Sequence, residues 1–271
     1  MSDIQYQNLN YSSSEIEHSY GSNVHIISNP VVQTILARLS RPETVQPLIS
    51  SYIEKLYNIL LLEVINNHFP KKNVSWDTRM KDLTPKGVFE GEIINSESKA
   101  ICVDLARAGT LPSEVCYREL HNLIDPKNIR QDHIYINRKV DEEGRVVGVN
   151  FTGSKIGGGQ NDSIVLLPDP MGATGSSLSY VLDEYKNKVD GKAKKYIAMH
   201  IIIAPEYIKL LQNNHPDLEI YTLRLDRGLS EKKALDSSPG TFPELEKGLT
   251  DTQYIVPGAG GVGEILNNSF V

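Results

Sequence analysis

The sequence predicts an α/β fold, in which a doubly wound and mainly parallel sheet is flanked by helices. Short runs of branched apolar residues, such as 164–167 and 196–203, are typical of strands buried on both faces. Stretches with helical spacing follow several of these runs, and the repeating strand–helix order indicates a parallel sheet covered on both sides. With 271 residues, the chain buries ample core in one domain, which we expect over residues 23–271.

The first part of the chain predicts a tail, a short strand and two helices. Residues 1–22 are polar, which favours a flexible tail or an arm that orders on a partner subunit. A short strand is expected at 23–27, and Pro30 suits the first turn of a helix that runs to about residue 40. Residues 43–67 keep one apolar stripe at helical spacing, which indicates a core or subunit-interface helix. His68 ends that helix and is expected to be a surface or capping residue.

The next part predicts strands around two turns. Residues 73–95 suggest two short strands around Thr84-Pro85, and 100–105 is a continuous apolar strand that leads into a helix at 112–123. Residues 133–140 and 146–151 alternate around an acidic turn with glycine, which indicates a β-hairpin arm. The three glycines at 157–159 favour a flexible connector, with a phosphate cradle as the alternative.

The central stretch, residues 163–177, combines a strand, a carboxylate, a loop of small residues and the start of a helix. Asp169 follows the buried strand, small residues fill 172–177, and helical spacing starts at Leu178. A helix N-terminus with small neighbouring side chains suits a phosphate. Asp169 lies where open α/β sheets bind ligands, and it would accept hydrogen bonds from sugar hydroxyls. The pattern therefore predicts a sugar-phosphate site; the alternative is an ordinary strand–helix turn with Ser177 as a helix cap.

Beyond this stretch the strand–helix order continues. A helix is expected from Pro205, a strand at 218–223, and a polar excursion at about 226–252, which is an insertion that covers the active site or a subunit contact. His200 falls in a buried strand, where a satisfied core histidine is expected, and His215 belongs to a turn.

Composition limits the partners and the compartment. The net charge is −6 with both signs spread along the chain, so nucleic acid is not expected as the main partner. No apolar run reaches bilayer length and no signal peptide is evident, so we expect no membrane partner and a cytoplasmic protein. Cys102 and Cys116 have no zinc spacing and are expected to be buried, which fits a reducing compartment.

The last glycines suggest a loop around a flat ligand. Gly258, Gly260 and Gly263 have dinucleotide-fingerprint spacing, but too few residues follow for the βαβ unit that the fingerprint requires. Glycine allows close approach and positive φ, so backbone groups in this loop can match the edge of a small planar molecule.

Several of these motifs resemble one family. The run from Asp169 to Ser177 closely resembles the phosphoribosyl pyrophosphate loop of uracil phosphoribosyltransferases, which share its Asp-Pro start. Arg107-Ala108-Gly109 is similar to the Arg-Ala-Gly of that family. Residues 204–206, 215–217 and 219–222 are also similar.

The resemblance implies a phosphoribosyltransferase-like fold with a small C-terminal hood, and an enzyme of pyrimidine salvage that makes UMP and pyrophosphate from uracil and phosphoribosyl pyrophosphate. It implies Mg²⁺ as cofactor and a homodimer or larger homo-oligomer. Asp169 and Arg107 would be catalytic. The residues implied to bind phosphoribosyl pyrophosphate are Arg107, Arg138, Asp169, Pro170, Met171, Gly172, Ala173, Thr174, Gly175, Ser176, Ser177 and Gly261. Arg145 competes with Arg138 for the role of second arginine.

The same resemblance assigns the base pocket. Ile255, Gly260, Gly261 and Val262 would lie against uracil, mainly through the backbone. Gly261 departs from the family, which has an aspartate there, and Glu264 replaces a second aspartate. Glu264 or Asp104 would compensate, Asp104 being either a second carboxylate of the crevice or a surface residue. Two alternatives therefore stay open: a transferase for another base, or a catalytically weak sensor or partner subunit that binds phosphoribosyl pyrophosphate.

Overall fold

The computed structural model describes residues 3–140 and 146–269, and in this part of the chain the predicted sheet is present. The strand order is β1-β10-β9-β7-β4-β5-β6, with β8 paired to β9. Every pair is parallel except the β5–β6 hairpin at one edge. The doubly wound, mainly parallel fold class is therefore confirmed.

The strands and helices follow the predicted order, and their bounds are these. The strands are β1 Val24–Ile26, β2 Lys71–Asp77, β3 Val88–Ile94, β4 Lys99–Ala106, β5 Ile129–Val140, β6 Val146–Lys155, β7 Ser163–Pro168, β8 Met171–Gly172, β9 Lys195–Ile203 and β10 Glu219–Leu225. The α-helices are α1 Pro30–Leu39, α2 Leu48–His68, α3 Thr110–Leu120, α4 Ser176–Lys188, α5 Pro205–Asn214, α6 Lys232–Leu235 and α7 Val262–Leu266. Single 3₁₀ turns occupy Ile4–Tyr6 and Pro126–Asn128.

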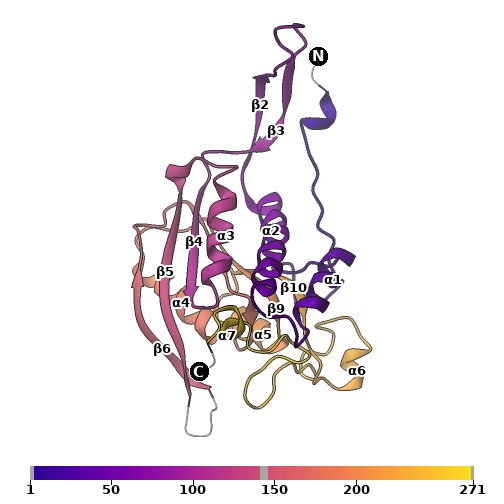
Figure 1. Cartoon of the computed structure of the whole chain (residues 1–271), viewed down its shortest axis with the longest axis vertical. Helices are drawn as coiled ribbons and strands as arrows, with labels where there is room; N and C mark the ends of the chain where they lie inside the picture. Colours follow the sequence, from indigo (N-terminus) through magenta and orange to yellow (C-terminus); the bar gives the residue numbers. More distant parts are fainter. Residues whose placement is uncertain (1–2, 141–145, 270–271) are drawn as a thin grey trace.

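Alternate residues of each central strand enter two separate cores. Cys102 and Leu166 pack with the buried faces of α1, α2 and α3, whereas Val103 and Leu167 pack with α4 and α5. This alternation follows from the two-residue period of a strand. The two helical layers lie on opposite faces of the sheet (Figure 1).

The chain reverses its winding between β4 and β7, which are neighbours in the sheet. From β4 it runs through α3 to β5 on one side, and from β7 through α4 to β9 on the other. The two helices therefore leave the carboxyl ends of β4 and β7 toward opposite faces. A crevice at that point is where doubly wound sheets bind their ligands.

Helix α2 begins five residues later than the apolar pattern predicts. It starts at Leu48, directly after Pro47. Proline disfavours the helical conformation of the residue before it, so Gln46 and the residues ahead of it stay outside the helix. The prediction of a helix from residue 43 was wrong at this end.

The N-terminal segment contacts the rest of the chain at several points: the 3₁₀ turn Ile4–Tyr6 lies beside β3, and residues 11–20 contact the body of the protein. The Tyr11 hydroxyl donates to Glu63 of α2 at 2.5 Å, and Glu15 forms a β-bridge with Ile27. The Tyr20 hydroxyl hydrogen-bonds Glu246. The tail expected at 1–22 is thus joined to its own chain between residues 11 and 20, because tyrosine hydroxyls there meet buried carboxylates.

Two further predictions concern the turns. Strands β2 and β3 are the two short strands expected around Thr84-Pro85, and they form a hairpin that projects beyond the main sheet (Figure 1). The connector at 157–159 is held by hydrogen bonds: Arg130 donates to the carbonyls of Gly158 and Gly159, and the amide of Gly157 donates to Asp132. These bonds tie the connector to β5. Among the described residues, no helix is both long and apolar enough to cross a membrane.

Candidate active site

A pocket of about 630 Å³ lies at the carboxyl ends of β4 and β7, where the winding reverses. It combines three predicted segments: the turn after β4, the loop after β7 and the glycine-rich loop near the C-terminus. Its lining includes Leu105, Ala106, Arg107, Ala108, Ile136, Asp169, Met171, Gly172, Ala173, Thr174, Gly175, Ser177, Leu178, His200, Tyr207, Thr252, Gln253, Tyr254, Ile255, Gly260, Gly261, Val262, Gly263 and Glu264.

The loop after β7 is held in a tight conformation by its own carboxylate. Oδ1 of Asp169 accepts a hydrogen bond from the backbone N–H of Met171 at 3.0 Å. A β-carbon added at Gly172 would lie 2.7 Å from Ile203 and 2.9 Å from Tyr207, so only glycine fits there. The loop therefore packs directly on β9 and α5, with its backbone facing the pocket.

Helix α4 begins at Ser176, and its N-cap is Gly175 with a φ of 83°. Left-handed backbone of this kind favours glycine, and no side chain caps the helix. The alternative in which Ser177 caps the helix was therefore wrong. Thr174 and Ser177 line the pocket beside the N-terminus, where backbone N–H groups and partial positive charge favour an anion.

His200 supports the loop from β9. Its Nδ1 donates to the carbonyl of Asp169 at 2.6 Å, and its Nε2 therefore accepts from the Tyr207 hydroxyl. Burial lowers the pKa of His200 to about 4, so the ring is neutral at pH 7. The expected satisfied core histidine is confirmed, and this histidine also reaches the pocket wall.

Arg107 extends from the end of β4 into the same pocket. Its side chain is exposed, and no described residue forms a hydrogen bond or ion pair with the guanidinium. The guanidinium is free to accept an anionic ligand in two-pronged geometry.

Three other predicted residues are placed differently. Pro170 is buried and its carbonyl accepts from Ile201 and Ile202, so it shapes the loop without lining the pocket. Ser176 starts α4 and also lies outside the lining. Arg138 lies on β5 opposite Val149, but its side chain is outside the described residues, as is the whole of Arg145.

An ion pair fixes the glycine-rich loop to the end of β10. Arg224 and Asp226 are joined by two hydrogen bonds of 2.6 and 2.8 Å, and each also bonds the backbone of Gly258. A β-carbon at Gly258 would lie 2.1 Å from the Ile255 carbonyl, and its φ is 59°, so this turn requires glycine. This Arg224–Asp226 clamp holds the loop in place, and Ile255 and residues 260–263 of the loop line the pocket.

We expect Asp226→Ala to lower the free energy of unfolding by about 3 kcal/mol, because it leaves a half-buried arginine and a backbone amide unpaired. Denaturant unfolding followed by circular dichroism measures this. Asp236→Ala, which breaks the exposed ion pair with Lys232, is the matched control and should change the value by less than about 0.5 kcal/mol. Equal losses in both variants would contradict the role of the clamp.

Glu264 supplies a carboxylate where Gly261 lacks one. A β-carbon added at Gly261 would lie 2.5 Å from Oε2 of Glu264, so the Glu264 carboxylate fills the space into which a side chain at 261 would project. Both residues line the pocket, on the same side as the first turn of α7.

Both alternatives predicted for Asp104, a second carboxylate of the crevice and a surface residue, were wrong. It is buried, its two oxygens bond the Thr110 hydroxyl at 3.0 Å and Nδ1 of His133 at 2.8 Å, and it does not line the pocket. It belongs to an inward-facing position of β4, so it acts within the core and cannot replace the missing aspartate.

The polar excursion at 226–252 borders the site at its end. Its end reaches the pocket at Thr252, followed by Gln253 and Tyr254. The carboxylate of Glu206 in α5 accepts hydrogen bonds from the amides of Gly248 and Leu249 and anchors this end. Both alternatives predicted for the excursion, a cover for the active site and a subunit contact, stay predictions.

Sequence reasoning missed several residues of the wall. Tyr207 faces the pocket from the first turn of α5, and Ile136 reaches it from β5. The signal for Tyr207 was its place in the first turn after a buried strand, at the same sheet edge as Asp169. For Ile136 no signal in the sequence distinguishes a wall residue from a core residue.

Comparisons with known proteins point to one family. The family model for uracil phosphoribosyltransferase matches residues 26–243. The uracil phosphoribosyltransferase of Dictyoglomus turgidum is 28% identical over 251 residues, covering 90% of this chain and 98% of the relative. That of Lactococcus lactis subsp. cremoris is 27% identical over 245 residues, with coverages of 90% and 98%. A solved structure from Aquifex aeolicus matches in fold with a TM-score of 0.66 and 21% identity, covering 90% of this chain and 97% of that one.

The fold and the site together define a phosphoribosyltransferase, a pentosyltransferase that moves a phosphoribosyl group to a base. With most of its length matched by one family model, the chain belongs to the uracil phosphoribosyltransferase family.

Proposed function

We propose that this protein transfers the phosphoribosyl group of phosphoribosyl pyrophosphate to uracil, giving UMP and pyrophosphate. The observation that carries the proposal is the convergence of Arg107, the loop 169–177 and the glycine-rich loop 255–263 on one pocket. These segments are far apart in the sequence, and each offers a group that a different part of the two substrates requires.

The 5-phosphate would lie on the loop that leads into α4. Backbone amides of residues 172–177 and the hydroxyls of Thr174 and Ser177 supply donors, and the helix N-terminus supplies positive charge. Asp169, at the other end of the loop, would accept hydrogen bonds from the ribose hydroxyls. Its second function is to hold the Met171 amide and so keep the loop closed.

The pyrophosphate would be bound by Arg107. As the bond between the sugar and the pyrophosphate breaks, negative charge grows on the leaving group and the sugar becomes cation-like. A guanidinium at that point stabilises the transition state more than the ground state. The base nitrogen then attacks the sugar carbon, with no protein nucleophile required.

Mg²⁺ is part of the proposal, and the donor set of the pocket fits it. The carboxylates of Asp169 and Glu264 offer the oxygen ligands that this ion prefers, together with oxygens of the substrate. When bound, the ion would neutralise charge on the pyrophosphate.

The base would lie in the glycine-rich loop, against the backbone of Ile255 and Gly260 and beside Val262. Uracil presents alternating donors and acceptors along its edge, which backbone N–H and C=O groups can match. The Arg224–Asp226 pair holds this loop at the end of β10 through its bonds to Gly258.

An assay with labelled phosphoribosyl pyrophosphate, Mg²⁺ and a panel of bases tests the proposal. We expect UMP with uracil and little product with other bases. Product with another base alone would show that this base, and not uracil, is the substrate. Tight binding of phosphoribosyl pyrophosphate without turnover would favour the sensor or partner subunit that the glycine at 261 suggests.

The Glu264 carboxylate is expected to replace the missing side chain at 261, and a swap of positions tests this. Glu264→Ala should lower kcat/KM by about tenfold or more. Gly261→Asp alone should also lower it, because its new carboxylate would collide with Glu264. The double variant should recover activity to within about threefold of the wild type, since the two sites are coupled. Additive losses in the double variant would contradict the exchange.

A further inference from the structure

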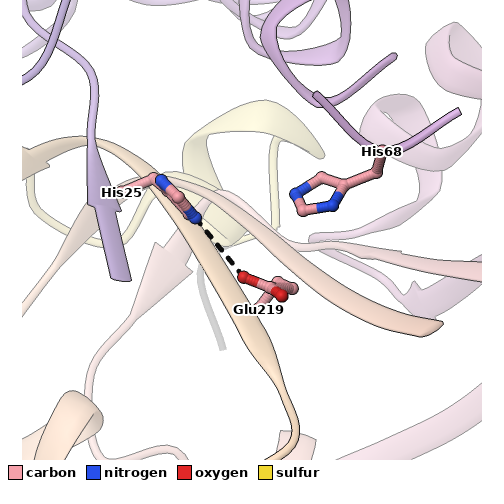
Figure 2. A group of neighbouring side chains, drawn as sticks. All are labelled: His25, His68 and Glu219. Carbon is pink, nitrogen blue, oxygen red and sulfur yellow. Dashed lines mark hydrogen bonds and ion pairs between the residues drawn. The ribbon is translucent and has the colours of Figure 1, made fainter. Parts of the chain in front are cut away.

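We propose that His25, His68 and Glu219 form a zinc-binding site at the amino-terminal edge of the sheet, away from the active-site pocket. One ligand atom of each side chain lies within 4.8 Å of the others (Figure 2). The three residues come from β1, the end of α2 and the start of β10, so the fold brings together positions that are far apart in the chain.

The spacing already suits a tetrahedral ion on one side. Nε2 of His25 and Oε2 of Glu219 are 3.3 Å apart. With zinc–ligand bonds of 2.0–2.1 Å, two ligands of a tetrahedral ion lie roughly 3.3 Å apart. All three ligand atoms lie within 4.8 Å of one another, so a small movement of the His68 ring would bring it to tetrahedral spacing. A water molecule would fill the fourth position. Two imidazoles and one carboxylate are a known zinc donor set with an open position.

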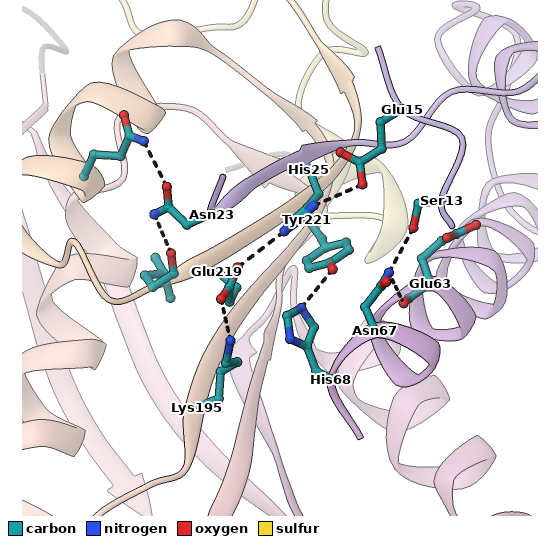
Figure 3. A network of polar contacts seen from close by, with 12 residues as sticks. Ser13, Glu15, Asn23, His25, Glu63, Asn67, His68, Lys195, Glu219 and Tyr221 are labelled. Carbon is teal, nitrogen blue, oxygen red and sulfur yellow. Dashed lines mark hydrogen bonds and ion pairs between the residues drawn. The ribbon is translucent and has the colours of Figure 1, made fainter. Parts of the chain in front are cut away.

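Neighbouring groups hold the two rings in place (Figure 3). Glu15 meets Nδ1 of His25 at 3.1 Å, which leaves Nε2 directed at Glu219. A carboxylate behind a histidine ligand fixes the ring and strengthens it as a donor. The His25 ring stacks on Tyr221, with centroids 4.2 Å apart, and the Tyr221 hydroxyl hydrogen-bonds Nε2 of His68 at 2.8 Å.

The site is half-buried and open to an ion from solution. The side chains of His25 and Glu219 are 19% and 15% exposed. His68 was expected to be a surface or capping residue; instead, β10 packs against the end of α2 and gives it polar partners.

The positive charge of Lys195 lies beside Glu219 and should weaken zinc binding. A variant without this charge therefore tests the proposal. Its Nζ lies 2.5 Å from Oε1 of Glu219 and competes for that carboxylate. A zinc ion on Oε2 would meet the positive charge of this ammonium on Oε1, and the ammonium is one-third exposed and can turn into solvent. Removing this positive charge should therefore strengthen zinc binding, whereas in a plain hydrogen-bond network it would only remove a contact.

The experiment is a calorimetric titration of the full-length, EDTA-treated protein with zinc chloride. We expect one zinc per chain at this site in the wild type. His68→Gln should weaken it at least about 100-fold, since even loss of a supporting partner costs 10–100-fold. Lys195→Met should tighten it about tenfold. His121→Gln, a half-buried histidine of the α3 C-terminus, is the matched control and should bind like the wild type.

A second readout is independent of binding heat. Zinc should raise the Tm of the wild type and of Lys195→Met, but not of His68→Gln. Cobalt in place of zinc should give the strong visible absorption bands of a tetrahedral ion in the wild type but not in His68→Gln. Equal zinc binding by the wild type and His68→Gln, or no binding by either the wild type or Lys195→Met, would overturn the proposal and leave a hydrogen-bond network that joins β1 to α2.

Discussion

Asp169→Asn is expected to lower kcat/KM by about 10²–10³-fold, the loss typical of removing one electrostatic group from a transition state. Asparagine keeps an oxygen that can accept from the Met171 amide, so the loop should keep its conformation. The change removes only the negative charge that would face the ribose hydroxyls and Mg²⁺. Steady-state kinetics with uracil and phosphoribosyl pyrophosphate measure the effect.

The stability of this variant distinguishes a functional from a structural role. The Tm of Asp169→Asn should stay close to that of the wild type, and Asp183→Asn, an exposed acid of α4 outside the pocket, should leave both activity and Tm unchanged. A fall in Tm that accounts for the lost activity would show that Asp169 acts mainly through folding.

Arg107→Lys is expected to lower kcat/KM by about 100-fold, because lysine keeps the charge but loses the planar, two-pronged contact with the pyrophosphate. The loss should appear in kcat as well as in KM for phosphoribosyl pyrophosphate, since charge on the leaving group grows toward the transition state. Pre-steady-state and steady-state kinetics separate the two.

Stability should be unaffected in this variant, because no described residue pairs with the Arg107 guanidinium. Arg118→Lys is the control: this arginine lies on α3, pairs with Glu114 and is outside the pocket. If Arg107→Lys behaved like Arg118→Lys, the pyrophosphate would have to be bound elsewhere.

The sequence predicts the central unit of this protein well because its signals are local. A run of branched residues in β7, Asp169, small residues up to Ser177 and a helical stripe each follow from short-range chemistry. The same holds for Arg107 after β4, since the carboxyl ends of parallel strands share one edge. The glycine at 258 also has a local cause, the contact with the Ile255 carbonyl.

What the sequence does not reveal depends on distant contacts. Asp104 has an apolar strand around it, and only the position of His133 on the neighbouring β5 shows that it is satisfied in the core. Whether Glu264 compensates for Gly261 depends on the turn into α7. His68 looks like a helix end, and its partners on β1 and β10 lie far along the chain in opposite directions.

The most direct test is a crystal structure of the protein with phosphoribosyl pyrophosphate and Mg²⁺. We expect the 5-phosphate on the backbone amides of residues 172–177, the ribose hydroxyls on Asp169 and the pyrophosphate beside Arg107. Ligand density outside this loop, or an Asp169 side chain turned away from the sugar, would contradict the account.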